Sequence, residues 1–229
     1  MAARFAALGE TVVITGRRED RVKAVAAELG VRGVACDGTE PAQIAALVSQ
    51  LGPVVDVLVN NAGGNTDFAP QADFPEHGLA EELTLEAAAW RANLDANLLT
   101  AVLTTQAVAP LMPAGGSVIS IGSIGAERGA GSYGAAKAAL AAWSLTVSAE
   151  LGPRGITSNV VSSGYVEGTD FFRDTLTPER RASLIAATHD KRAGRVADLA
   201  ETVLFLASPG ARHLTGQTIH VNGGAYLTR

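Results

Sequence analysis

The amino-acid sequence predicts an α/β fold, in which helices cover both faces of a doubly wound parallel sheet. Short β-branched runs alternate with helical patterns, 47% of the 229 residues are hydrophobic, and no linker-like stretch divides the chain. Such alternation implies parallel strands joined by right-handed crossovers. We therefore expect one domain, 1–229, built around a single large core.

The first half of the chain predicts three strands and three helices. Apolar runs predict the strands, at 11–15, 34–36 and 54–59. The helices are expected at 1–10, 19–29 and 41–51. Two glycines mark helix ends, because Gly9 and Gly30 suit the left-handed C-cap conformation. The first of these helices therefore ends directly before the first strand.

The second half continues the alternation. Its expected strands are 117–122, 156–161 and 217–221. Its expected helices are 85–112, with a break near Asn97, 132–151 and 198–207. The glycines Gly125, Gly129 and Gly131 allow the chain to turn from the first of these strands back into a helix.

Composition narrows the function to small-molecule chemistry. The net charge of −5 has no basic block beside it, which argues against a nucleic-acid groove or an anionic membrane patch, and no apolar run reaches the ~20 residues of a membrane span. The single cysteine, Cys36, excludes an internal disulfide and fits a reducing compartment, so we expect a cytoplasmic protein. Metal-ligand spacing is missing from the four histidines: His77, His189, His213 and His220.

The strongest catalytic signal is Tyr133 with Lys137, four residues apart and so on one face of a helix. A nearby ammonium favours the phenolate, and we expect it to lower the pKa of the Tyr133 phenol. Taken alone the pair is also compatible with an ordinary surface pair. Ser123 ends the preceding strand ten residues upstream, and Ser120, thirteen upstream, is a second candidate hydroxyl.

Five ordered motifs resemble the short-chain dehydrogenase/reductase family along the whole chain. They are Asn60-Asn61-Ala62-Gly63, Trp90 with Asn97-Leu98, the Ser123, Tyr133 and Lys137 set, the segment 152–159 and the segment 214–224. The resemblance implies a Rossmann-like sheet and an NAD(P)-dependent oxidoreductase acting on carbonyl or alcohol groups. It places the last segment, 221–229, near subunit interfaces, which implies a homodimer or homotetramer.

The resemblance also implies the catalytic roles. Ser123 would orient the substrate oxygen, and Tyr133 would give or take its proton. Lys137 would bind the nicotinamide ribose, and Asn97 would hold a water that connects the lysine to solvent. Ser163 stands where relatives commonly have proline, which leaves the turn at Gly164 less rigid.

The cofactor residues implied by the resemblance favour NADP over NAD. Arg17 and Arg18 follow a strand where an acidic residue would bind a ribose 2′-hydroxyl, and two guanidiniums suit a 2′-phosphate. They could instead be solvated arginines at a helix start. Asp37 resembles the aspartate that accepts from adenine, or is a plain turn residue. The remaining expected cofactor contacts are Gly38, Asn60, Ala62, Gly63, Gly164, Val166 and Thr169.

One family motif is missing from the sequence. The glycine-rich turn T-G-x-x-x-G-x-G, whose amides hold the cofactor pyrophosphate, does not occur, and residues 1–10 resemble the second half of the helix that follows it. We therefore expect a truncated form without a pyrophosphate site and without a central strand. Strands 11–15 and 54–59 should then close up on one another, accept a segment of another chain, or shift with the N-terminal region as a unit.

Substrate specificity is poorly encoded. The loop 64–84 and the segment 165–194 flank the expected pocket, and their apolar residues could form its wall or pack a lid onto the body: Phe68, Phe74, Tyr165, Phe171, Phe172 and Leu176. Two hypotheses follow for the whole chain. It is an NADP-dependent oxidoreductase with impaired cofactor binding, or a non-catalytic oligomerising or ligand-binding protein derived from that family.

Overall fold

Six parallel strands carry the fold in the computed structural model, which describes residues 1–68 and 78–228. The strands are β1 (Val13–Gly16), β2 (Arg32–Ala35), β3 (Val57–Asn60), β4 (Ser117–Ser123), β5 (Thr157–Ser163) and β6 (Thr218–Val221). The helices are α1 (Ala2–Ala7), α2 (Glu19–Leu29), α3 (Pro41–Val48), α4 (Leu79–Leu94), α5 (Thr100–Val108), α6 (Gly125–Arg128), α7 (Gly131–Leu151), α8 (Pro178–Ala186) and α9 (Val196–Ala207). Every strand pair is parallel, as the alternation predicts.

Within the described residues the strands form two sheets. β1 pairs with β2, and a second sheet runs in the order β3-β4-β5-β6. The expectation that β1 and β3 close up on one another is therefore wrong. A layer of helices holds the strands in place, because α2 packs on β1 and β2, α3 packs on α5, and α5 packs on β3. The two other expected outcomes, a segment of another chain or a displacement as a unit, stay predictions.

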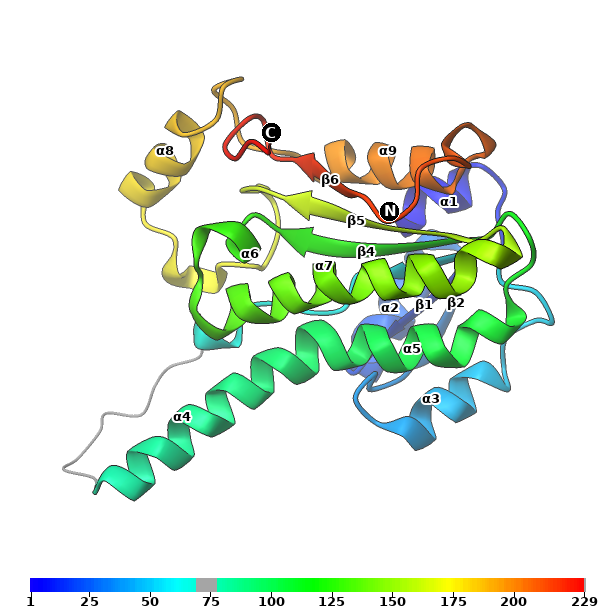
Figure 1. Cartoon of the computed structure of the whole chain (residues 1–229), viewed down its shortest axis with the longest axis horizontal. Helices are drawn as coiled ribbons and strands as arrows, with labels where there is room; N and C mark the ends of the chain where they lie inside the picture. The colour runs from blue at the N-terminus through cyan, green and yellow to red at the C-terminus, as the bar shows by residue number, and fades with distance from the viewer. Residues whose placement is uncertain (69–77, 229) are drawn as a thin grey trace.

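Helices cover both faces of the four-stranded sheet, which makes the fold doubly wound (Figure 1). On one face Ile119 and Val161, both fully buried, pack against α9 through Val203 and its neighbours. On the other face α7 lies along β4 and β5, and the Ser144 and Ser158 hydroxyls are 3.0 Å apart across that contact. The carboxyl ends of β4 and β5 thus meet the beginning of α7.

A smaller cluster joins the two-stranded sheet to the body. The side chains of Cys36, Ile44 and Leu47 are buried together, and Leu103 of α5 packs against them. The thiol of Cys36 lies in this cluster, and burial raises its pKa. The segment after β2 is therefore anchored to the same helix that covers β3.

Helix boundaries agree with the sequence pattern where local caps decide them. α2 ends at Gly30 with a φ of 65°, the left-handed conformation expected of a C-cap glycine. α4 begins at Leu79, six residues before the expected start, so part of the expected loop 64–84 is helical. α8 was not predicted, although Thr177 accepts from the Arg180 N–H and Pro178 is its first residue, both recognisable start signals.

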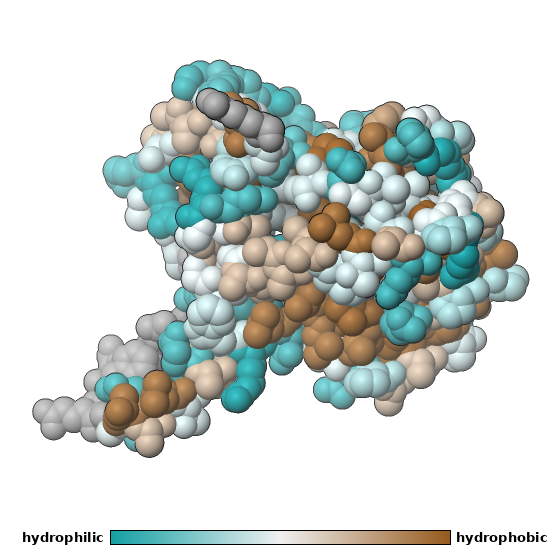
Figure 2. Space-filling view, in the orientation of Figure 1, coloured by the Kyte–Doolittle hydropathy of each residue, from teal (hydrophilic) through white to brown (hydrophobic). Residues whose placement is uncertain are grey.

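α4 projects from the body of the molecule (Figure 1), and Asn93 is its buried residue. Figure 2 shows hydrophobic side chains on the surface of this projecting helix. The large apolar side chains exposed along α4 are Leu79, Leu83, Leu85 and Trp90. Within the described residues, most of α4 is therefore exposed.

Candidate active site

Tyr133 and Lys137 lie in the first two turns of α7 and are both 5% exposed. The Lys137 Nζ is 5.9 Å from the centroid of the Tyr133 ring, and it donates a hydrogen bond to the Ile121 carbonyl at 2.8 Å. The tyrosine and the lysine therefore share one face of the helix, against the end of β4, as their spacing predicts.

Ser123, the last residue of β4, lies beside Tyr133, since a Cβ built at Gly125 would be 3.3 Å from Ser123 Oγ and 3.4 Å from Cε1 of the Tyr133 ring. Its Oγ also accepts from the Gly125 N–H at 3.1 Å, which fixes the hydroxyl at the turn into α6. Ser120, the alternative candidate, is 1% exposed and lies 3.4 Å from the side-chain nitrogen of Asn60 in the core. The geometry thus brings Ser123, and not Ser120, to the tyrosine; its catalytic role stays a prediction.

The electrostatics of the pair differ from the sequence-based expectation. Burial raises the pKa of the Tyr133 phenol, and the hydrogen bond with Ser123 offsets only part of that rise. The expectation that Lys137 lowers the pKa of the Tyr133 phenol below its ordinary value is therefore wrong. Burial lowers the pKa of the Lys137 ammonium from its ordinary 10.5 to about 8, because removal from water disfavours the charged form, and no carboxylate among the described residues pairs with it.

Asn97 lies in a π-helical turn, Asp95–Leu99, between α4 and α5. π-turns inside α-helices are often found at functional sites. Its side-chain oxygen accepts from the Gly64 N–H at 3.0 Å, and its side-chain nitrogen donates to the Gly64 carbonyl at 2.9 Å. The amide of Asn97 thus holds the loop after β3. Binding of a water by Asn97 stays a prediction.

Asn93 was not among the candidate residues, yet it has no exposed surface and contacts the catalytic region. Its side-chain nitrogen donates to Asp67 Oδ1 and to Ser132 Oγ, both at 2.7 Å. Ser132 directly precedes Tyr133, and Asn93 lies one helical turn before Asn97. A polar residue four positions before Asn97 was a usable signal, since side chains at that spacing share a helix face.

The expected cofactor residues at the carboxyl end of β1 are positioned for an anion. Arg17 and Arg18 are exposed, and Arg18 is the N-cap of the eleven-residue helix α2. Helix N-termini favour negative charge. The Asp37 carboxylate accepts two hydrogen bonds from Thr39, from its N–H at 3.0 Å and from its hydroxyl at 2.7 Å. These hydrogen bonds hold the pKa of Asp37 below its ordinary value, and Arg17 adds to the effect. Asp37 therefore has the contacts of a turn aspartate, although an adenine contact is compatible with them.

The residues after β3 divide into buried and exposed ones. Asn60 is buried, and its side chain donates to Thr105 Oγ1 at 2.9 Å, so the amide faces the core, while a cofactor contact of Asn60 stays a prediction. Ala62 and Gly63 are exposed at the end of the strand. A side chain at position 63 would place its Cβ 2.5 Å from Asn97 Oδ1, so this loop requires glycine. The backbone of 62–63 is the part that can contact a ligand.

The segment 165–194 starts and ends at one point of the sheet edge. Val166 forms a parallel bridge with Gly194, and the Gly194 N–H donates to the Tyr165 carbonyl at 2.9 Å. Gly164 packs so closely on Asn222 that a Cβ would lie 2.9 Å from that residue's Cβ. Thr169 is exposed and donates to the Val166 carbonyl at 3.2 Å, so its expected cofactor contact stays a prediction.

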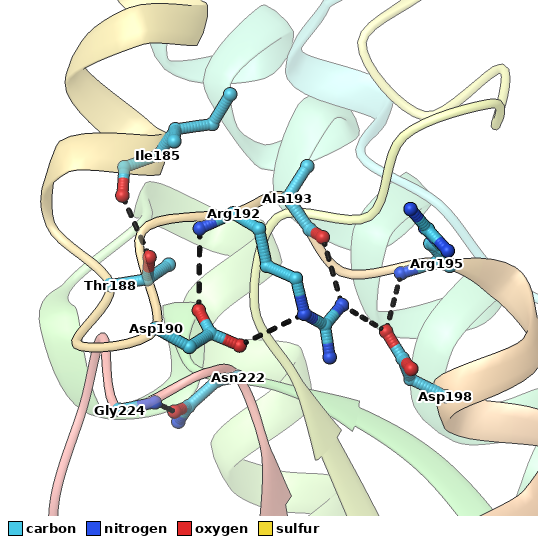
Figure 3. A network of polar contacts seen from close by, with 9 residues as sticks. All are labelled: Ile185, Thr188, Asp190, Arg192, Ala193, Arg195, Asp198, Asn222 and Gly224. Atoms are coloured by element: carbon cyan, nitrogen blue, oxygen red, sulfur yellow. Dashed lines mark hydrogen bonds and ion pairs between the residues drawn. The ribbon is translucent and has the colours of Figure 1, made fainter.

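A charged network anchors the far end of this segment to α9 (Figure 3). Arg192 contacts Asp190 at 3.2 Å and Asp198 at 2.6 Å, and donates to the Ala193 carbonyl at 3.1 Å. Asp198 also accepts from the Arg195 N–H at 2.8 Å, which caps α9. Just before the network, the His189 N–H donates to the Gly223 carbonyl at 2.7 Å, so this end of the segment lies beside the turn after β6.

Aromatic side chains from the segment pack against Tyr133. The rings of Tyr133 and Phe171 have centroids 5.4 Å apart, Phe171 and Phe172 are 5.0 Å apart, and Tyr165 and Phe172 are 5.8 Å apart. This cluster contains three of the residues expected either to form the pocket wall or to pack a lid onto the body, and both alternatives stay predictions. Phe74 and His77 lie outside the described residues, as does the side chain of Phe68. Across the described residues, no cluster of histidine, cysteine or carboxylate side chains could hold a metal ion.

Comparison with known proteins identifies the family. The family model described as enoyl-(acyl carrier protein) reductase matches residues 1–226. The chain belongs to the short-chain dehydrogenase/reductase family. By family it is therefore an oxidoreductase acting on CH–OH and C=O groups.

Two relatives illustrate how far this short-chain dehydrogenase/reductase resembles characterised sequences. It is 34% identical over 237 residues to the 3-oxoacyl-[acyl-carrier-protein] reductase of Escherichia coli, covering 99% of this chain and 91% of that protein. It is 33% identical over 241 residues to the short-chain reductase protein NovJ of Streptomyces niveus, covering 97% of this chain and 87% of that protein.

Solved structures confirm the Rossmann-like fold of this short-chain dehydrogenase/reductase. A short-chain dehydrogenase/reductase from Brucella melitensis aligns with a TM-score of 0.81 at 27% identity, over 99% of this chain and 90% of that one. A blue fluorescent protein from a metagenomic library, crystallised with NADPH, aligns with a TM-score of 0.79 at 34% identity, over 98% and 91%. Within the described residues, the helices are too short or too polar to cross a bilayer.

Proposed function

We propose that the protein is an NADP(H)-dependent oxidoreductase that reduces a small carbonyl compound or oxidises the matching alcohol in the cytoplasm. The observation that carries this proposal is the meeting of Ser123 and Tyr133 beside Gly125, where a Cβ would lie 3.3 Å from the serine Oγ and 3.4 Å from Cε1 of the tyrosine ring, with the Lys137 ammonium 5.9 Å from that ring. Two hydroxyl-bearing side chains and an ammonium gathered at the end of β4 suit a carbonyl oxygen that must gain or lose a proton. The named activities of the relatives support the same chemistry.

In this mechanism the residues of the chain manage the substrate oxygen and its proton. The nicotinamide, when bound, supplies or accepts the hydride. Ser123 donates a hydrogen bond that orients the substrate oxygen, and Tyr133 gives the proton in reduction and takes it in oxidation. Because burial raises the pKa of Tyr133, the phenol is kept protonated and ready to act as the acid. The aromatic rings of Phe171 and Phe172 limit water at that oxygen.

The cofactor fits this site at two of its parts. Within the described residues Lys137 donates one hydrogen bond, to the Ile121 carbonyl, so its ammonium has protons left for ribose hydroxyls. Arg17 and Arg18, exposed at the start of α2, suit the 2′-phosphate of NADP. No glycine-rich turn leads into a long helix within the described residues, and each missing charged hydrogen bond to the pyrophosphate costs about 1.5 to 3 kcal/mol. Weak binding of the cofactor is therefore part of the proposal.

The proposal is tested with Tyr133→Phe, which removes one hydroxyl and keeps the ring that packs on Phe171. Ketone-dependent oxidation of NADPH should fall by at least 100-fold, with the affinity for NADPH unchanged by calorimetry. Tyr226→Phe is the control, because that ring packs on His220 away from the site. Near-normal turnover by Tyr133→Phe would exclude this tyrosine as the proton donor.

Cofactor choice is tested separately. Replacing Arg17 and Arg18 by serine should weaken NADPH binding and leave NADH binding unchanged, because the second cofactor lacks the 2′-phosphate. Arg4→Gln, which removes an exposed ion pair with Glu201, is the control for a lost surface arginine. An equal loss for both cofactors would show that the arginines do not read the 2′-phosphate.

A second candidate, a non-catalytic oligomerising protein, has its own supporting observation. The exposed positions of α7 from 131 to 149 carry no charge, and they include Ala135, Ala138, Ala142, Leu145, Thr146 and Ala149. A helix without a polar face is normally buried, and this face of small residues suits the same face of a second copy. We therefore propose a homo-oligomer through α7, and this is compatible with the catalytic function.

The assembly is tested by Ala142→Arg, which places a charge at the centre of that face. The mass measured by ultracentrifugation should fall to that of one chain, and Ala24→Arg, on the exposed side of α2, should leave it unchanged. Oligomers that persist in Ala142→Arg would move the interface elsewhere. If Ala142→Arg dissociates the oligomer and the wild-type protein shows no NADPH-dependent turnover, the non-catalytic candidate is favoured.

A further inference from the structure

A closed triangle of hydrogen bonds joins three separate elements next to Tyr133. Asn93 of α4 donates to Asp67 Oδ1 and to Ser132 Oγ, each at 2.7 Å. Ser132 Oγ in turn donates to the same Asp67 oxygen at 2.9 Å. Ser132 is the second residue of α7 and Asp67 belongs to the short 3-10 turn Thr66–Phe68, so the triangle fixes where α7 begins.

The same asparagine also holds the turn that carries Asn97. The Asn93 side-chain oxygen accepts from the Thr66 N–H at 3.1 Å, and its main-chain carbonyl accepts from Asn97 Nδ2 at 3.0 Å. Asn97 Nδ2 lies 3.4 Å from the Asn93 side-chain oxygen as well. Every polar atom of the Asn93 side chain is therefore used, which is required of an amide with no exposed surface.

The arrangement is more specific than core packing needs. An apolar side chain would fill this buried helix position without any partner, whereas an asparagine must be matched atom by atom. The partners are the residue before Tyr133, the turn beside the Gly63-Gly64 loop, and Asn97. Gly131 approaches the network so closely that a Cβ there would lie 3.2 Å from Asp67 Oδ2. The start of α7 is thereby held at a fixed distance from the turn.

We propose that Asn93 is a positioning residue that, through Asp67 and Ser132, sets the place of the Tyr133 hydroxyl relative to Ser123 and the Asn97 turn. The inference rests on the proposed function for its effect on turnover. Its structural part, the position of the tyrosine, does not depend on any activity. Asn93 touches neither substrate nor cofactor and acts through Ser132 and Asn97.

The first measurement is spectroscopic, so that it needs no cofactor or substrate. Fluorine-labelled tyrosine gives three resonances, for Tyr133, Tyr165 and Tyr226, which single Tyr→Phe variants assign. In Asn93→Leu, which is nearly isosteric and removes every hydrogen bond of the amide, the Tyr133 resonance should shift while that of Tyr226 stays in place. Asn159→Leu is the matched control. Asn159 is equally buried, with bonds to the Leu214 carbonyl and the Gln217 N–H, but lies in β5 away from the triangle.

The second measurement is turnover in the same variants. Asn93→Leu should lower kcat by about 10- to 100-fold, as expected when a reacting group is displaced by a fraction of an ångström to one ångström, with KM for NADPH unchanged. Asp67→Ala should reproduce the effect, and Asp67→Asn should restore most of the rate, because an amide oxygen can still accept both hydrogen bonds. Asn159→Leu should lose stability without losing kcat.

The possible outcomes separate this proposal from the proposed function. If the Tyr133 resonance shifts in Asn93→Leu while the wild-type protein shows no turnover, the positioning is supported and the oxidoreductase is rejected. An unmoved Tyr133 resonance in folded Asn93→Leu would overturn the positioning, whatever happens to stability. If Asn93→Leu does not fold, Ser132→Ala and Asp67→Ala remove the other two corners, and an unmoved Tyr133 resonance in both would equally overturn it.

Discussion

Replacing Lys137 by methionine isolates the free-energy cost of a buried ammonium. The side chain is 5% exposed and has a carbonyl, but no carboxylate, as its partner. Burial lowers the pKa of Lys137 from 10.5 to about 8, and at about 1.4 kcal/mol for each pKa unit this corresponds to about 3 kcal/mol. Methionine fills a similar volume and carries no charge, so the variant avoids that cost.

The pH dependence has a definite sign. Below pH 8 both the folded and the unfolded wild type hold the lysine proton, so the cost is fully present. Between pH 8 and 10.5 the folded form releases the proton before the unfolded form does, and wild-type stability should rise relative to Lys137→Met by about 3 kcal/mol. Tyr133, whose pKa burial raises above its ordinary 10.0, has the opposite effect from about pH 10 upward, but it is present in both proteins and cancels.

The assay is chemical denaturation of both proteins at closely spaced pH values from 7 to 10.5. The quantity compared is the difference between their free energies of unfolding. Lys191→Met, which removes an exposed ammonium, shows how much a general loss of charge contributes. A difference that stays flat across this range would refute the conclusion that Lys137 is buried as an ammonium ion, and with it the placement of the lysine against Tyr133.

Three further outcomes follow from the fold. Asn60→Ala removes a buried donor to Thr105, so the free energy of unfolding should fall by about 1 to 3 kcal/mol; loss of NADPH affinity at unchanged stability would contradict the core placement of this amide. Val203→Ala empties a fully buried position between α9 and the sheet and should cost about 1 to 3 kcal/mol in denaturation; a cost below about 0.5 kcal/mol would mean that the contact collapses freely. In hydrogen exchange, amides of 1–60 should exchange faster than those of 117–160, since β1 and β2 form only a two-stranded sheet; uniform protection would contradict the division into two sheets.

The sequence predicted those parts of the site that local pattern controls. The strand that ends at Ser123 and the helix spacing of Tyr133 and Lys137 are read from neighbouring residues, and the structure places all three together. The pKa direction of Tyr133 was missed, because burial depends on packing by Phe171, which is 38 positions away along the chain. Local spacing indicates which groups can meet, but the solvent around them is set by distant segments.

Asn93 and Asn60 also show that local sequence patterns do not predict long-range side-chain contacts. Asn93 stands at a helical spacing from Asn97 that suggests a shared face, but its partner Asp67 is 26 residues away and nothing in the local pattern connects them. Asn60 occurs in a recognisable motif, yet its side chain faces Thr105 in the core. The division into two sheets was likewise beyond the strand pattern, since pairing depends on the helices that hold β1 and β3 apart.

The bridge between Val166 and Gly194 has a consequence for engineering. Because this bridge joins the two ends of the intervening segment, those ends stay adjacent whatever the length of the segment. Doubling the length of a flexible loop adds only about 0.6 kcal/mol of closure entropy. Residues 167–189 can therefore be exchanged as a cassette from a relative with another substrate, because Gly194 and the Arg192 network lie outside that range and β5, α9 and the Tyr133 helix stay as they are.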